Sequence, residues 1–199
     1  MIEDNNIIKA NDYGIPIIRS ESHILLEKFV KAQNPVNILE IGTAIGYSGK
    51  TILNSCNGNL VTIEHDLKLA KIAKQTFKDN GLDKRANVIV GDCMVEVAKM
   101  VASKKFDNYF DFVFLDGPKA QYDLLLDSLI LLLKPSGTFV ADNVLFRGYV
   151  ESNTAPTKRY KTIIKRLDNF IKNCKNHPKL ANFKLYNIED GVIFANKVQ

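Results

Sequence analysis

Acidic and basic side chains follow two short apolar runs in the middle of the chain, FVFLDGPK (residues 112–119) and FVADN (residues 139–143). Asp116 ends the first run, Lys119 comes three residues later, and Asp142 and Asn143 end the second run. If the runs are neighbouring strands of a parallel sheet, about 4.8 Å apart, their ends bring two carboxylates and an amide oxygen together. Oxygen ligands of this kind suit Mg²⁺, with Mn²⁺ or Ca²⁺ as alternatives, and a cation removes the repulsion between the carboxylates. The pattern therefore predicts a metal site.

A cation bound at this site would favour chemistry on a hydroxyl group. It would lower the pKa of a bound hydroxyl, and Lys119 could accept the proton because a nearby cation depresses the pKa of a lysine. Each residue also has a structural alternative: Asp116 could cap the next helix, Lys119 could be solvated, and Asp142-Asn143 could begin a loop. Their combination at adjacent strand ends favours a site.

The elements that must position these residues alternate along the chain. Strands are predicted at residues 37–42, 60–64, 87–90, 112–116 and 138–142. Helical apolar spacing lies between them, at residues 47–55, 67–80, 94–103 and 122–133. Two more β-like runs, residues 183–187 and 192–196, flank IEDG and predict a hairpin with an antiparallel last strand. We expect one α/β domain over residues 1–199: a Rossmann-like, seven-stranded, mostly parallel sheet with a C-terminal antiparallel hairpin and helices on both faces.

The loop after the first strand, LEIGTAIGYSG (residues 39–49), predicts a cofactor site. Its glycines, Gly42 and Gly46, have GxxxG spacing rather than the GxGxxG of dinucleotide sites. Gly42 would let a ligand approach the backbone, and the next helix would point its N-terminus at an anion. The carboxylate of S-adenosylmethionine (SAM) is such an anion, and Glu40 would suit its ammonium group, directly or through water. A lone GxxxG could equally be a packing turn.

Two further strand ends carry acids. Glu64 could accept both ribose hydroxyls of a nucleoside, and Asp92 could bind the adenine amino group. Because Glu64 would also suit NAD, the GxxxG spacing and the terminal hairpin are the features that favour SAM.

With these motifs in order, the chain resembles the metal-dependent class I SAM O-methyltransferase family, which includes catechol and caffeoyl-CoA O-methyltransferases. The resemblance runs from about residue 15 to the C-terminus and depends on LEIGTAIGYS, IEHD, GD, FLDGPK and ADNV. It implies SAM as cofactor, a homodimer, and roles for the residues that match the family's motifs. These are Asp116, Asp142 and Asn143 as metal ligands, Lys119 as the base, with Asp116 also catalytic, and Ile18, Gly42, Ser48, Glu64, Asp92 and Asp116 beside the cofactor.

Departures from the family indicate the acceptor. Gly117-Pro118 stand where the catechol enzyme has an aromatic wall, and the chain has no tryptophan. Its short length and DNVLFRGYV (residues 142–150) look more like the bacterial branch that contains tRNA 5-hydroxyuridine methyltransferase. That resemblance implies methylation of the 5-hydroxyl of uridine 34 in the anticodon loop of tRNA, giving 5-methoxyuridine. Candidate RNA contacts are Arg147, Lys158, Arg159, Lys165 and Arg166.

The alternatives are specific. The basic residues could form the solvated face of an amphipathic helix, and Phe146 and Tyr149 could be core rather than a platform on which a base stacks. The acceptor could be a small catechol-like or phenolic hydroxyl. A nicotinamide-dependent oxidoreductase shares the sheet but not GxxxG and the hairpin, and a non-catalytic RNA-binding module gives no reason for the metal residues.

The composition suits a soluble globular domain: 199 residues, 46% hydrophobic and 25% charged. No apolar run reaches the roughly 18 residues of a membrane span, and MIEDNNIIKAND lacks the apolar segment of a secretory signal. Three scattered cysteines without a CxxC pair favour a reduced, cytoplasmic compartment. The net charge of +5 is compatible with an anionic partner, and equally with a lysine-rich surface.

Overall fold

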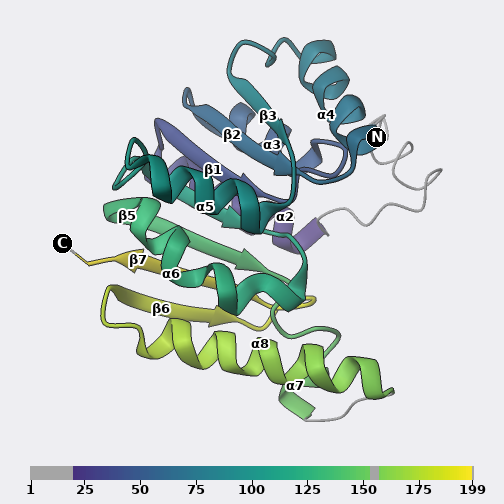
Figure 1. Cartoon of the computed structure of the whole chain (residues 1–199), viewed down its shortest axis with the longest axis vertical. Helices are drawn as coiled ribbons and strands as arrows, with labels where there is room; N and C mark the ends of the chain where they lie inside the picture. Colours follow the sequence, from purple (N-terminus) through teal and green to yellow (C-terminus); the bar gives the residue numbers. More distant parts are fainter. Residues whose placement is uncertain (1–19, 153–156, 199) are drawn as a thin grey trace.

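The fold is organised around a seven-stranded sheet with the strand order β3-β2-β1-β4-β5-β7-β6 (Figure 1). The computed structural model describes residues 20–152 and 157–198. Five strands are parallel, and β7 is antiparallel to both β5 and β6. The predicted hairpin is thereby confirmed. The strands cover the following residues: β1 Asn37–Ile41, β2 Asn59–Glu64, β3 Ala86–Val90, β4 Phe110–Leu115, β5 Leu133–Asp142, β6 Leu180–Tyr186 and β7 Val192–Lys197.

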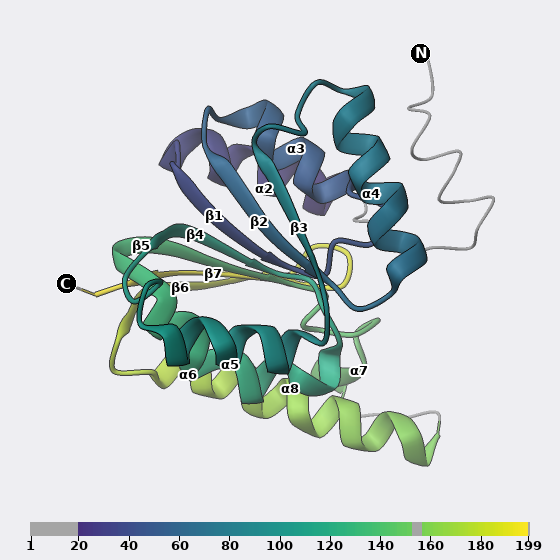
Figure 2. The same cartoon turned by 45° about the horizontal axis from the view of Figure 1, so that its top comes forward.

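Helices cover both faces of the sheet, as expected. Figure 2 shows α2, α3 and α4 on one face, with α5, α6 and α8 on the other. The short elements η1 and α7 lie in the connections after β4 and β5. The bounds are α2 Ser20–Gln33, α3 Tyr47–Ser55, α4 Leu67–Asp79, α5 Cys93–Ser103, η1 Lys119–Gln121, α6 Tyr122–Leu132, α7 Tyr149–Ser152 and α8 Lys158–Asn176.

The side chains of the central strands alternate between two apolar clusters, one on each face of the sheet. On β4, Phe112 and Phe114 belong to the cluster beneath α2, α3 and α4, whereas Val113 and Leu115 belong to the other. All four are at most 1% exposed. A strand whose two faces are both covered by helices is a continuous apolar run, which explains why this strand could be predicted from sequence.

The largest differences from the sequence prediction concern α2, β5 and β6. The helix α2 was not predicted, because its inward residues Leu26 and Val30 are accompanied by Ile24, which is 52% exposed and blurs the apolar periodicity. β5 begins at Leu133 rather than at residue 138, since Leu133 pairs with Phe110 across a register shift. β6 likewise begins early, before an irregularity in its pairing with β7.

The sheet places the ends of β4 and β5 next to each other, because Leu115 pairs with Ala141. Asp116 and Asp142 follow these paired residues directly, so the expected neighbourhood of the two acids is present. Among the described helices, none is long and apolar enough to cross a membrane.

Candidate active site

Two adjoining hollows lie at the carboxyl ends of the parallel strands. The larger has a volume of about 490 Å³ and the smaller about 260 Å³. Both are lined by Gly42, Glu64, His65 and Pro118, so they share a wall. Crevices beyond the carboxyl ends of parallel strands are where α/β proteins bind nucleoside-type ligands.

Gly42 ties the first strand to the fourth. A Cβ atom on this residue would lie 2.3 Å from the carbonyl oxygen of Asp116, and its φ of 97° is unfavourable for other residues. The Gly42 amide donates to the Ile63 carbonyl (3.0 Å), and the Asp116 amide donates to the Ile41 carbonyl (2.9 Å). Gly42 therefore has the packing role that was the alternative to a cofactor site, and it also lines both hollows.

The helix α3 begins directly after this loop. Gly46 is its N-cap and, being a glycine, has no side chain to accept a hydrogen bond from the first amides. Ile45, Tyr47 and Ser48 from the same turn line the larger hollow. The amides of a first helical turn and the positive end of the helix dipole, at a cavity wall, form a site for a carboxylate or another anion.

Glu40 is fully buried and does not line either hollow. Its carboxylate accepts hydrogen bonds from Ser48 Oγ (2.5 Å) and Thr62 Oγ1 (2.6 Å). Burial raises the pKa of Glu40 to about 7, against the lowering effect of these two hydrogen bonds. The direct contact with an ammonium that the sequence suggested is thus not what the geometry presents; Glu40 instead holds Ser48, which does line the larger hollow.

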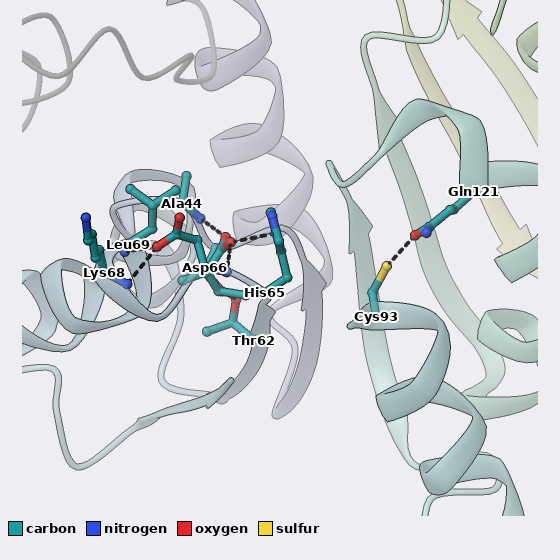
Figure 3. A network of polar contacts seen from close by, with 10 residues as sticks. Ala44, Thr62, His65, Asp66, Lys68, Leu69, Cys93 and Gln121 are labelled. Carbon is teal, nitrogen blue, oxygen red and sulfur yellow. Dashed lines mark hydrogen bonds and ion pairs between the residues drawn. The ribbon is translucent and has the colours of Figure 1, made fainter. Parts of the chain in front are cut away.

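Glu64 lies on the wall that the two hollows share. It is 5% exposed, and its carboxylate accepts from the amides of Ala44 (2.8 Å) and Asp66 (2.9 Å). His65 Nδ1 is 3.1 Å from the same carboxylate. Figure 3 shows Ala44, His65 and Asp66 converging on this network. An ionised carboxylate has about four acceptor positions, so these contacts orient Glu64 without exhausting its capacity to bind a diol.

The smaller hollow is closed by residues from α5 and η1. Asp92 lines it, but its carboxylate also caps α5 by accepting from the amides of Met94 (2.8 Å) and Val95 (3.3 Å). Cys93 Sγ donates to Gln121 Oε1 (2.9 Å; Figure 3), and both residues line the hollow. Sequence reasoning missed this pair, because a lone cysteine and a lone glutamine carry no recognisable spacing.

The predicted metal ligands meet at the ends of β4 and β5. Asp142 is 1% exposed; its Oδ1 accepts from the Asn143 amide (2.7 Å). Its Oδ2 is buried and accepts no hydrogen bond from the described residues. Burial and the charge of Asp116 raise the pKa of Asp142. A buried, unpartnered carboxylate oxygen beside a second carboxylate fits a divalent cation, which would satisfy the oxygen and neutralise the repulsion.

Asn143 completes this donor set. It has φ 57°, and it lines the larger hollow together with Asp116. The described part of the chain contains no group of three or more His, Cys, Asp and Glu arranged to hold a metal. The predicted ligands Asp116, Asp142 and Asn143 supply two carboxylates and one amide, a composition that favours hard cations such as Mg²⁺.

Lys119 is bound to one of these acids. Its Nζ donates to Asp116 Oδ1 (2.9 Å) and to the hydroxyl of Tyr122 (2.7 Å), which donates in turn to the Asp142 carbonyl (3.0 Å). Burial lowers the pKa of Lys119, but the charge of Asp116 and the contact with Tyr122 outweigh it, so the pKa is raised. The lowered pKa that the sequence predicts for Lys119 beside a bound cation stays a prediction. Tyr122 was missed, since it looks like an ordinary apolar position of α6.

The outer wall of the larger hollow is formed after β5 and by the terminal hairpin. Phe146, Arg147 and Asp190 line it. Phe146 packs edge-to-face on Tyr160 of α8, with ring centroids 5.3 Å apart, and lies 6.1 Å from the ring of Tyr149. Phe146 was interpreted either as a core residue or as a platform for a base. The geometry allows both functions, because the ring packs against Tyr160 and the residue also lines the larger hollow.

The basic candidates separate into different environments. Arg147 lines the cavity, and Lys165 is exposed on α8. Arg166 donates to the carbonyl oxygen of Ala120 (2.9 Å), which ties α8 to η1. Ile18 and the side chains of Lys158 and Arg159 lie outside the described part of the chain.

Comparisons with known proteins find relatives of one class. Residues 7–198 match the protein family described as O-methyltransferase. A catechol O-methyltransferase of Niastella koreensis is 32% identical over 60% of this chain and 55% of that protein. A caffeoyl-CoA O-methyltransferase of Stellaria longipes is 27% identical over 63% of this chain and 53% of that protein. The chain therefore spans little more than half the length of these curated relatives.

A solved structure has the same fold. The O-methyltransferase from Bacillus cereus, in complex with S-adenosylhomocysteine (SAH), superposes with a TM-score of 0.83. The superposition covers 97% of this chain and 89% of that one, at 24% sequence identity.

Proposed function

We propose, since the chain belongs to the O-methyltransferase family, that it transfers a methyl group from SAM to an acidic hydroxyl with the help of a divalent cation. One observation carries the proposal. The buried Oδ2 of Asp142, which has no hydrogen-bond partner among the described residues, lies at the strand end next to Asp116, and Asp116 is bound by Lys119. The site thus combines an acid, a base candidate and a carboxylate oxygen that has no partner among the described residues, and a nucleoside-sized crevice lies beside it. This combination suits deprotonation of a hydroxyl next to a cofactor.

Residues of three loops would bind the cofactor. The start of α3, whose N-cap is a glycine, suits the carboxylate of SAM, Glu64 suits its ribose hydroxyls, and Asp92 lies in the hollow that would hold adenine. The same fold carries SAH in the B. cereus protein, which supports SAM as the cofactor. SAM supplies an electrophilic methyl carbon attached to a positively charged sulfur.

Asp116, Asp142 and Asn143 would hold Mg²⁺, with Mn²⁺ or Ca²⁺ as alternatives. When bound, the cation supplies Lewis-acid polarisation of the acceptor hydroxyl. Lys119 would take the hydroxyl proton at Nζ as a neutral amine, which requires that Nζ leave the present ion pair with Asp116 and first lose its own proton to solvent. The acceptor oxygen forms a bond to the methyl carbon while the bond from carbon to sulfur breaks and sulfur keeps the electron pair. Tyr122 keeps Nζ beside the strand ends throughout.

For the acceptor we propose the 5-hydroxyl of 5-hydroxyuridine at position 34 of tRNA. Exposed cations of α8, including Lys161 and Lys165, lie on the helix that also supplies Tyr160 to the aromatic group around Phe146. Cations beside aromatic rings at a cavity mouth suit a single-stranded base with its phosphates. The catechol O-methyltransferase among the relatives favours a second candidate, a catechol-like hydroxyl.

One experiment separates these acceptors. The protein is incubated with SAM and Mg²⁺, and either with tRNA that carries 5-hydroxyuridine or with catechol, and mass spectrometry then detects 5-methoxyuridine or methylated catechol. Product from tRNA alone supports the tRNA proposal, and product from catechol alone contradicts it. Chelation of the metal should abolish either product, so full activity in chelator would contradict the metal requirement.

A surface test accompanies it. Reversing the charges of Lys161 and Lys165 should weaken tRNA binding and flatten its salt dependence, because fewer counterions are released. Reversing Lys71 and Lys74, which are exposed on α4 on the other face of the sheet, is the matched control (Figure 2). Equal effects of the two pairs would show only non-specific attraction.

The homodimer stays a prediction that light scattering can test.

A further inference from the structure

The loop that follows β5 has an unusual backbone. Asn143, Phe146, Arg147 and Gly148 all have positive φ, at 57°, 47°, 59° and 73°. The left-handed conformation costs an ordinary L-residue about 1 kcal/mol or more, and it persists only where the surroundings hold it. Something must therefore fix residues 143–148 in place.

The turn of the terminal hairpin, residues 188–191, provides this support. The amide of Leu145 donates to the Asp190 carbonyl (2.7 Å), and the amide of Val144 donates to the Gly191 carbonyl (3.1 Å). The amide of Arg147 donates to Oδ1 of the Asp190 side chain (3.0 Å). The contact is close: a Cβ atom on Gly191 would lie 2.3 Å from Leu145 Cγ. Loop and turn, 43 residues apart between Arg147 and Asp190, thus form one unit.

The same turn also anchors the first described helix. Glu189 has φ 48°, and its carboxylate accepts from the amides of Glu21 (3.3 Å) and Ser22 (3.1 Å) at the start of α2. Neighbouring acids of one turn therefore hold two different segments, α2 through Glu189 and the loop through Asp190. A simple hairpin turn would need neither side chain for its own geometry.

The loop held in this way presents two residues to the larger hollow. Phe146 and Arg147 both line it, and Asn143, a proposed metal ligand, begins the same loop. The aromatic group of Phe146, Tyr149 and Tyr160 continues this wall outward. The cofactor loop at residues 42–48 is held from another strand, because its first amide donates to the Ile63 carbonyl of β2 (3.0 Å). The loop at residues 143–148 and the cofactor loop at residues 42–48 are therefore held by different parts of the fold.

We propose that Asp190 is a positioning residue for the acceptor, which it serves by holding Phe146 and Arg147 at the wall of the larger hollow. The role toward an acceptor rests on the proposed function; the tether between Asp190 and the loop does not. Loss of the Asp190 side chain should loosen the loop and weaken acceptor binding, and it should leave the cofactor side unchanged. A residue with only a general structural role would affect both sides.

The test compares Asp190→Ala with Asp190→Asn, whose amide oxygen can still accept from the Arg147 amide. Asp83→Ala, at an exposed position between α4 and β3, is the control. Hydrogen exchange of the peptide that covers residues 143–149 should become about tenfold faster in Asp190→Ala, as expected for one lost hydrogen bond. The Asn variant should keep most of the protection, and the control should keep all of it.

Kinetics complete the test. In Asp190→Ala, the KM for 5-hydroxyuridine tRNA or catechol, whichever is methylated, should rise about tenfold while the KM for SAM changes less than about twofold. The proposal is overturned if exchange and acceptor KM stay unchanged, if both KM values rise together, or if Asn behaves as Ala. If neither acceptor is methylated, the proposed function fails, and the exchange data alone decide whether Asp190 holds the loop.

Discussion

Lys119 Nζ and Asp116 Oδ1 lie 2.9 Å apart, so the base candidate and one proposed metal ligand form an ion pair. The pairing keeps Lys119 protonated, because the carboxylate raises the pKa of its ammonium group. A cation bound at Asp116 would compete with Lys119 for the same carboxylate. Metal binding and the availability of the base are therefore connected through Asp116.

Replacement of Lys119 by alanine should lower kcat about 100- to 10,000-fold, the usual contribution of a general base. The affinity for SAM should stay the same, since the groups proposed to bind its carboxylate, ribose and adenine belong to other loops. Calorimetric titration with SAM and turnover with the acceptor measure the two effects. Lys134→Ala is a matched control, because Lys134 forms a similar ion pair with Asp111 (2.8 Å), away from the residues that line the two hollows. An unchanged turnover in Lys119→Ala would remove this residue from the mechanism.

Asp142→Asn should make the protein more stable without added metal and less responsive to Mg²⁺. The substitution removes a buried charge whose Oδ2 has no hydrogen-bond partner among the described residues, and we expect a gain of about 1 kcal/mol. Thermal unfolding in chelator and in Mg²⁺ measures both effects. Asp127→Asn, at a side chain 91% exposed, should change neither. A variant that melts below the wild type in chelator would contradict the prediction.

Gly42→Ala should destabilise the protein and abolish SAM binding. Two costs add: the positive φ of 97°, and a Cβ atom placed 2.3 Å from the Asp116 carbonyl oxygen. Gly81→Ala separates these costs, because Gly81 has φ 68° but no atom within 4 Å of the position that a Cβ would take. We expect Gly42→Ala to lose at least about 2 kcal/mol more than Gly81→Ala in urea unfolding. Similar losses would show that backbone strain alone requires the glycine.

The stability of the protein should depend on pH through Glu40. Its pKa is raised to about 7 by burial, above the ordinary value of 4.5 in an unfolded chain. The folded state therefore binds the extra proton, and the contribution is full below the unfolded pKa and is lost as pH rises through about 7.

Glu40→Gln should remove this dependence, so that the variant loses about 1 to 3 kcal/mol less stability than the wild type between about pH 5 and pH 8. Urea unfolding at both pH values provides the measurement. Asp83→Asn should keep the slope of the wild type, because the residue is exposed. Parallel curves for the wild type and Glu40→Gln would show that Glu40 does not titrate in this range.

Much of the fold and half of the site could be predicted from local sequence. Buried parallel strands are continuous apolar runs, and the residue that follows such a run must lie at the carboxyl edge of the sheet. For this reason Gly42, Glu64, Asp116 and Asp142 could be assigned to one edge before any coordinates were known. Boundaries were less certain, as β5 shows, since Leu133 joins the strand only through its pairing with Phe110.

The chemical groups at the strand ends can be identified from the sequence, because the periodicity of apolar residues is a local property. How those groups are used depends on the packing of the folded chain. Burial turned Glu40 into a support for Ser48, and proximity paired Lys119 with Asp116 and Tyr122. The hold of Asp190 on the Arg147 amide joins residues 43 positions apart. This last contact depends on how separate elements pack, and no spacing along the chain encodes it.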